Sequence, residues 1–135
     1  MTWWMIVLGI VLLVVVALVI LRLVNPAPQH VTGDDAVVLT FKLKNEGMAT
    51  VGELSDFCGL EKRIERAVVR AQVASWDGHG SGEGVFDIFF YGPDGERLWS
   101  VIEPVLAAEK HPRGHATIRR GAVNDPQAKV RTVEL

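Results

Sequence analysis

Most of the side chains that could catalyse a reaction or hold a metal ion lie in one stretch of the sequence. They are Asp77, His79, Glu83, Asp87, His111 and His115. A zinc site needs three or four ligands in convergent geometry, and hydrolysis by acid/base catalysis needs a positioned proton donor and acceptor. A proline and a glycine between His111 and His115 prevent the helix that would bring these two rings together. We therefore expect solvated side chains, with no metal site, no cofactor and no catalytic residue. The alternative is a small metal-binding protein or hydrolase that uses the 77–87 loop together with His115.

Cys58 is the single cysteine of the chain. A nucleophilic thiol needs a base beside it, and His79 is the next histidine along the sequence. No flanking motif or basic cluster indicates an activated thiol. We expect a half-buried structural thiol and a protein that is not an enzyme.

Alternating glycines precede the strongest strand signal of the chain. They are Gly78, Gly80, Gly82 and Gly84. Glycine-rich loops can bind phosphate through backbone N–H groups, but this segment lacks the Lys-Ser/Thr ending of a P-loop and the spacing of a dinucleotide fingerprint. Its neighbours Asp77 and Glu83 also disfavour an anion. The segment is interpreted as a flexible hairpin connection.

The N-terminus contains an unbroken apolar run. From Trp3 to Leu21 there is no charged residue and no proline, and a helix of this length covers roughly the 30 Å hydrocarbon core of a bilayer. Trp3 and Trp4 suit one membrane interface and Arg22 the other. No basic residue precedes the run, which disfavours a cleaved signal peptide. We expect residues 1–24 to be a single-pass membrane anchor.

Two features indicate on which side of the membrane the rest of the chain lies. Arg22 is the one basic residue near the apolar run, and positive charges favour the cytoplasmic side. A small exported domain often has paired cysteines, whereas this chain has Cys58 alone. Both features favour a cytoplasmic domain.

The remainder divides into a linker, residues 25–35, and a small domain, residues 36–135. The linker is rich in proline and polar residues. The whole chain has 14 basic and 16 acidic residues without a basic run, which gives no indication of a nucleic-acid partner. The segment 83–90 also departs from an RNA-recognition motif, because Glu83 stands where a basic residue is expected and Asp87 stands at an aromatic position.

Hydrophobic periodicity predicts alternating strands and helices. The expected elements are a half-buried strand over 37–44, a loop over 45–59 with room for one short helical turn, an amphipathic helix over 60–71 with Glu61 on its polar side, a short strand over 73–76, a strand over 85–91, a helix capped by Asp94, a strand over 115–120 and an edge strand over 129–135. Pro104 is expected to kink or shorten the second helix. This order favours a ferredoxin-like (split βαβ) two-layer α+β sandwich, with a β-grasp or another two-layer α+β fold as the alternative.

The segment from Phe86 to Asp94, with Leu98 and the run from Ile102 to Leu106, resembles a family of small bacterial α+β proteins with no assigned function. In this family a strand ends in Tyr-Gly-Pro-Asp and a helix closes with Pro-Val-Leu. The resemblance covers about Trp76 to Arg120. It implies the fold and transfers no activity, and the membrane anchor departs from the family's usual soluble form.

Strand alternation predicts that Phe86, Ile88 and Phe90 face the helices. Five side chains are then expected on the opposite face of the sheet: Lys42, Lys44, Phe89, Tyr91 and Arg119. Aromatic and cationic side chains are typical of protein interfaces. We expect a membrane-anchored, non-enzymatic interaction module that binds a protein partner or a second copy of itself. If the domain is exported, an immunity-type role in the cell envelope, such as neutralising a toxin, becomes the alternative.

Overall fold

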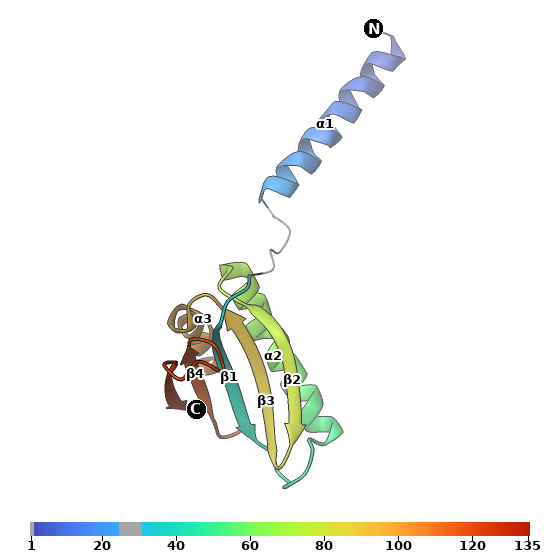
Figure 1. The fold of residues 1–135 in the computed structure, drawn as a ribbon. Helices are drawn as coiled ribbons and strands as arrows, with labels where there is room; N and C mark the ends of the chain where they lie inside the picture. Colours follow the sequence, from blue (N-terminus) through green and yellow to red (C-terminus); the bar gives the residue numbers. More distant parts are fainter. Residues whose placement is uncertain (1, 25–30) are drawn as a thin grey trace.

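The computed structural model describes residues 2–24 and 31–135, so most of the predicted 25–35 linker lies outside the described residues. The elements are α1 (Trp3–Val24), β1 (Asp35–Lys42), α2 (Val51–Ala71), β2 (Ser75–Gly82), β3 (Val85–Gly92), α3 (Gly95–Ala107), β4 (Gly114–Arg120) and β5 (Lys129–Glu134). The strands form one antiparallel five-stranded sheet in the order β2-β3-β1-β4-β5. Helices α2 and α3 both lie behind the sheet in Figure 1, which confirms the predicted α+β class.

The core lies between the sheet and these two helices. On the sheet side it contains Val37, Leu39, Phe41, Phe86, Ile88, Phe90, Ala116 and Ile118, and on the helix side Phe57, Leu60, Ile64, Val68, Leu98, Trp99, Ile102 and Leu106. Side chains alternate between the two faces of a strand, and the burial of β3 alternates from Val85 to Gly92 accordingly. The predicted inward set Phe86, Ile88 and Phe90 is confirmed, since all three are fully buried.

Helix α2 begins at Val51, so the predicted loop over 45–59 is wrong from that residue onward. A capping box starts the helix: the Thr50 side chain accepts a hydrogen bond from the Glu53 N–H, and the Glu53 carboxylate accepts one from the Thr50 N–H. The same carboxylate accepts a hydrogen bond from the Lys44 N–H at 2.9 Å. These bonds satisfy N–H groups that a helix start leaves without partners, and they tie α2 to the end of β1.

The glycine-rich segment is a strand, so the predicted flexible connection over 77–84 is wrong. Strand β2 continues to Gly82 and pairs with β3 along its length. The reversal takes only Glu83 and Gly84, whose φ angles of 52° and 77° are both positive, as two-residue hairpin turns require. Gly78, Gly80 and Gly82 lie opposite Phe89, Asp87 and Val85. They therefore share the sheet face that α2 and α3 leave open.

Helix α3 begins as predicted and ends later than predicted. The Asp94 side chain accepts hydrogen bonds from the N–H groups of Glu96 and Arg97, each at 3.1 Å. The helix continues to Ala107 with Pro104 inside it, so an early end at the proline is wrong. The Asp35 carboxylate also accepts hydrogen bonds from Gly95 N–H and Gly121 N–H, both at 2.8 Å. Asp35 thereby joins the start of β1 to the start of α3 and the end of β4.

Helix α1 contains 22 residues, and none of them is buried. Within the described part of the chain it is the one helix long and apolar enough to cross a membrane. Trp3 and Trp4 lie in its first turn and are 82% and 61% exposed, and Arg22 lies in its last turn. A core helix of a soluble protein would be buried. Helix α1 is exposed, and its length and composition are those expected of an anchor.

The capping box predicts a specific dependence of stability on pH. Hydrogen bonds from the backbone of Lys44 and Thr50 lower the pKa of Glu53 below its ordinary 4.5. Because the folded-state pKa is lowered, Glu53 contributes stability that is fully present above pH 4.5 and is lost as the pH falls through the lowered pKa. In Glu53→Gln the free energy of unfolding should therefore be lower at pH 7 and should fall less between pH 5 and 3. Urea unfolding of the full chain in detergent micelles measures both.

Glu46→Gln is the control, because Glu46 is an exposed carboxyl in the loop before α2. It should keep the parent's slope with pH. If Glu53→Gln and Glu46→Gln had the same slope, the ionised cap would not contribute as described.

Candidate functional site

The open face of the sheet brings together three of the five residues predicted for the interaction surface. Tyr91 and Arg119 lie opposite the same residue of β1, Ala36, from its two neighbouring strands. Ala36 is fully buried although it faces away from the helices. Its small side chain leaves room for the larger ones, and the Arg119 guanidinium lies 6.0 Å from the centre of the Tyr91 ring. This is the range of a cation–π contact.

Phe89 extends this cluster by one row. It lies opposite Val38, which in turn lies opposite Thr117 of β4. On its other side Phe89 faces Gly78, which has no side chain. The β2 residue directly opposite Phe89 therefore places no side chain against its ring. We call Phe89, Tyr91 and Arg119 the aromatic–arginine patch; all three are half-buried.

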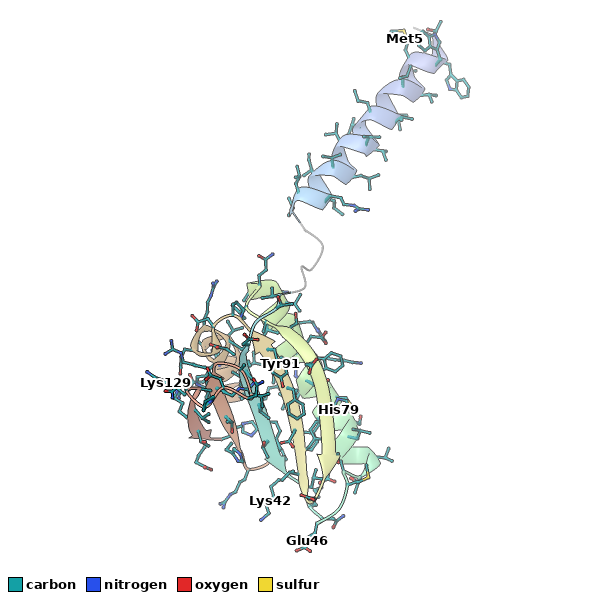
Figure 2. All side chains as sticks on the ribbon, in the orientation of Figure 1. Met5, Lys42, Glu46, His79, Tyr91 and Lys129 are labelled. Atoms are coloured by element: carbon teal, nitrogen blue, oxygen red, sulfur yellow. The ribbon has the colours of Figure 1, made fainter. Side chains whose placement is uncertain are left out.

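Lys42 and Lys44 do not join the aromatic–arginine patch. Lys42 lies six residues along β1 from Ala36, a distance of roughly 20 Å at strand rise. Figure 2 shows Lys42 at the far end of the sheet from Tyr91. Between them, the Thr40 hydroxyl donates a hydrogen bond to the Asp87 carboxylate. The predicted surface therefore divides into an aromatic–arginine end and a lysine end.

The two lysines line a cleft of about 980 Å³ between α2 and the loop before β4, which no motif in the sequence predicts. The basic residues around this cleft are Lys42, Lys44, Arg63, Lys110 and Arg113, with His111 beside them. Arg63 is already paired with Glu109, at 2.6 Å. Leu43, Phe57 and Leu60 supply apolar lining. The residues converge from β1, α2 and the 110–113 loop, so periodicity within one element could not predict them.

The residues proposed for the alternative metal or hydrolytic site are not brought together. His79 lies opposite Ile88, which is buried against the helices, so His79 is on the helix side of β2. Asp87 and His115 both lie opposite Thr40, on the open face. Asp77 is the extra residue of a β-bulge between Trp76 and Gly78. The sheet separates His79 from Asp87 and His115.

His79 instead meets two side chains of α2. Potential ligand atoms of Cys58, Glu61 and His79 all lie within 4.8 Å of one another, and Figure 2 shows His79 on the β2 edge beside α2. The helical spacing of the apolar residues over 60–71 predicts that Glu61 lies on the polar, solvated side of this helix. That placement is wrong, because Glu61 is only 5% exposed. The sequence signal for this cluster is the spacing Cys58-x-x-Glu61, which puts both side chains on one helix face.

The electrostatics of this cluster are unusual for the domain. Glu61 Oε2 lies 2.8 Å from His79 Nδ1. Burial raises the pKa of Glu61, and the neighbouring His79 opposes that rise. The His79 ring stacks on Phe86 with centroids 5.1 Å apart, and the Trp76 ring lies 6.5 Å away. A carboxyl, an imidazole and a thiol thus meet at an aromatic-lined edge of the core.

Comparisons with protein-family models, with curated proteins and with solved structures found no match to this chain.

The buried position of Ala36 predicts the effect of enlarging it. In Ala36→Leu the added atoms must displace Tyr91 and Arg119, which lie opposite Ala36. Overpacking of this kind costs about 1–3 kcal/mol of unfolding free energy. Urea unfolding of the full chain in detergent measures this loss. Val38→Leu is the matched control, because Val38 is half-buried on the same face of the same strand. Equal stability of the two variants would contradict the packing of the patch over Ala36.

Proposed function

We propose that this chain is a single-pass membrane protein whose α+β domain is a non-enzymatic protein-interaction module. Helix α1 is the anchor, and the aromatic–arginine patch binds the partner. The observation that carries the proposal is the combination of an apolar helix without a buried residue and a sheet face that α2 and α3 leave open. A tethered domain with an open aromatic face is suited to recruiting another protein to the membrane.

The anchor is supported by the two ends of α1. Tryptophan at positions 3 and 4 and arginine at position 22 match the residue types that membrane interfaces favour. Arg22 supports a cytoplasmic position for the domain, because it is the single basic residue of the helix. The unpaired Cys58 supports the same side.

The open face is supported as a docking surface by its chemistry. Tyrosine and arginine are enriched among residues that contribute most binding energy at interfaces. Arg119 is held in place by its contact with Tyr91 and by a hydrogen bond of 2.9 Å from its Nε to the Gly121 carbonyl. A side chain held in this way loses less conformational entropy on binding. The partner surface that fits is apolar opposite Phe89 and acidic opposite Arg119.

The strand order supports a finer assignment of the fold. Each of the helical connections β1-α2-β2 and β3-α3-β4 crosses one intervening strand of the sheet. This is the arrangement of the split βαβ plan, so we infer a ferredoxin-like domain with β5 added at the edge. In that plan both helices lie on one face, which leaves the other face for a partner. The resemblance around Tyr91 to Asp94 is consistent with the same assignment.

Photo-crosslinking in intact cells tests the docking surface. A photoreactive phenylalanine analogue replaces Phe89 in the full chain, and we expect a crosslinked protein at a defined mass. Arg119→Glu should reduce the yield about tenfold, which corresponds to ~1.4 kcal/mol, because it opposes an acidic partner. Lys129→Glu makes the same charge change at the exposed sheet edge and should leave the yield unchanged.

The product identifies the occupant. A band at twice the mass of the chain would identify a second copy as the partner. Absence of any crosslink at position 89, with equal expression of the variants, would overturn the proposed surface.

Reporter fusions test the orientation. A reporter that is active only in the cytoplasm and one that is active only after export are each fused to the C-terminus. We expect activity of the cytoplasmic reporter alone in intact cells. Activity of the exported reporter would contradict the argument from Arg22 and favour an envelope role, such as neutralising an incoming toxin. Arg22→Ser should reduce the excess of cytoplasmic over exported reporter activity, because it removes the one positive charge of α1.

A further inference from the structure

We propose that Cys58, Glu61 and His79 bind one divalent transition metal ion of the zinc class at the junction of α2 and β2. This site is on the helix side of the sheet, away from the aromatic–arginine patch, and is independent of the proposed docking function. Its ligands are a thiolate, a carboxylate and an imidazole, and each of these occurs in zinc sites.

The fold brings the three side chains together from two elements. Cys58 and Glu61 are three residues apart on α2 and share one helix face. His79 reaches them from β2 because the bulge at Asp77 turns the strand. The three potential ligand atoms lie within 4.8 Å of one another. Tetrahedral zinc, with bonds of about 2.0–2.3 Å, holds its ligand atoms roughly 3.3–3.8 Å apart, so small side-chain rotations bring these atoms to bonding distance.

Glu61 supplies a second, independent observation. Its Oε2 atom lies 2.8 Å from His79 Nδ1 and, apart from that contact, is the one enclosed side-chain polar atom among the described residues without a hydrogen bond. The Glu61 side chain is 6% exposed. A buried carboxylate needs a charged or hydrogen-bonding partner. A metal ion bound between Glu61 and His79 would be such a partner for both side chains.

The surroundings favour a metal with one remaining open position. Phe86 stacks on the His79 ring and Trp76 lies near it, so aromatic side chains enclose the imidazole on the domain side. The His79 side chain is 34% exposed and Cys58 is half-buried, which leaves a route for the ion and for a water molecule as fourth ligand. Sulfur and imidazole ligands select zinc or cobalt over magnesium and calcium.

Titration with cobalt tests the site in the full chain, prepared in detergent micelles without a polyhistidine tag. We expect one equivalent of Co²⁺ to produce the near-ultraviolet absorption of a cobalt–thiolate bond and the visible bands of a tetrahedral ion. Zn²⁺ should displace the cobalt and should raise the melting temperature of the protein, since a ligand that binds only the folded state stabilises it.

Variants assign the ligands. Cys58→Ser should abolish the thiolate absorption, and His79→Gln and Glu61→Gln should each weaken cobalt binding at least tenfold. His111→Gln and His115→Gln are the controls and should bind as the parent does, because the His111 ring packs near Phe41 and His115 lies on the open face opposite Thr40, both outside the Cys58, Glu61 and His79 cluster. Far-ultraviolet circular dichroism checks that each variant is folded. If His79→Gln does not fold, His79→Asn replaces it.

Two outcomes would overturn the proposal. The first is the absence of thiolate absorption in the folded parent at a tenfold excess of cobalt, which would leave Glu61 and His79 as an ion pair of the fold. The second is a signal that persists in Cys58→Ser or disappears in His115→Gln. Neither outcome bears on crosslinking at Phe89, so the two proposals fail separately.

Discussion

The alternation of side chains along β1 determines both the buried face and the open face of the domain. This strand pairs with β3 on one side and β4 on the other, so it sets the register of both. Val37, Leu39 and Phe41 are fully buried beneath the helices. A slip of one residue would move all three to the open face, at roughly 1.5–3 kcal/mol for each exposed side chain. The same register places Tyr91 and Arg119 on either side of Ala36, so the register of β1 determines both the core and the aromatic–arginine patch.

A bulge in β2 is the second constraint, because it decides which way His79 points. Trp76 and His79 are three residues apart, and in a regular strand they would lie on opposite faces. Trp76 lies opposite Phe90 and His79 opposite Ile88, both on the helix side, because Asp77 is an extra residue. A β-bulge redirects a side chain in this way and is common near functional sites. Without it, Gly78, Gly80 and Gly82 would face the helices, and His79 could not reach Glu61.

Local patterns in the sequence predicted those parts of the structure that depend on neighbouring residues. The alternation in β3 and the Asp94 cap are confirmed by the burial of Phe86, Ile88 and Phe90 and by the hydrogen bonds to Glu96 and Arg97. The start of α2 is equally local, but its signal, Thr50-x-x-Glu53, precedes a segment with poor hydrophobic periodicity, and that segment predicts a loop.

The positions that could not be predicted depend on contacts between distant elements. Burial of Glu61 follows from the approach of β2 to the side of α2, and the basic cleft forms only when Lys42 and Arg113 are brought to one end of the sheet. Helical periodicity predicts an exposed Glu61, because Glu61 lies outside the apolar stripe of α2 that packs on the central strands. The bulge at Asp77 had no reliable signal, since Gly78 and its neighbours fit both a loop and a strand.

The stability of strand β2 rests on few side chains. On the open face its residues 78, 80 and 82 are glycines, which pack nothing there and cost conformational entropy on folding. On the helix side, His79 contacts Glu61 of α2 and Phe86, and the Trp76 ring lies beside the His79 ring. Strand β2 is also an edge of the sheet. A metal ion held by one strand residue and two helix residues would join β2 to α2. Edge strands held by few contacts open most readily, so occupancy of the site would determine how firmly β2 stays in the sheet.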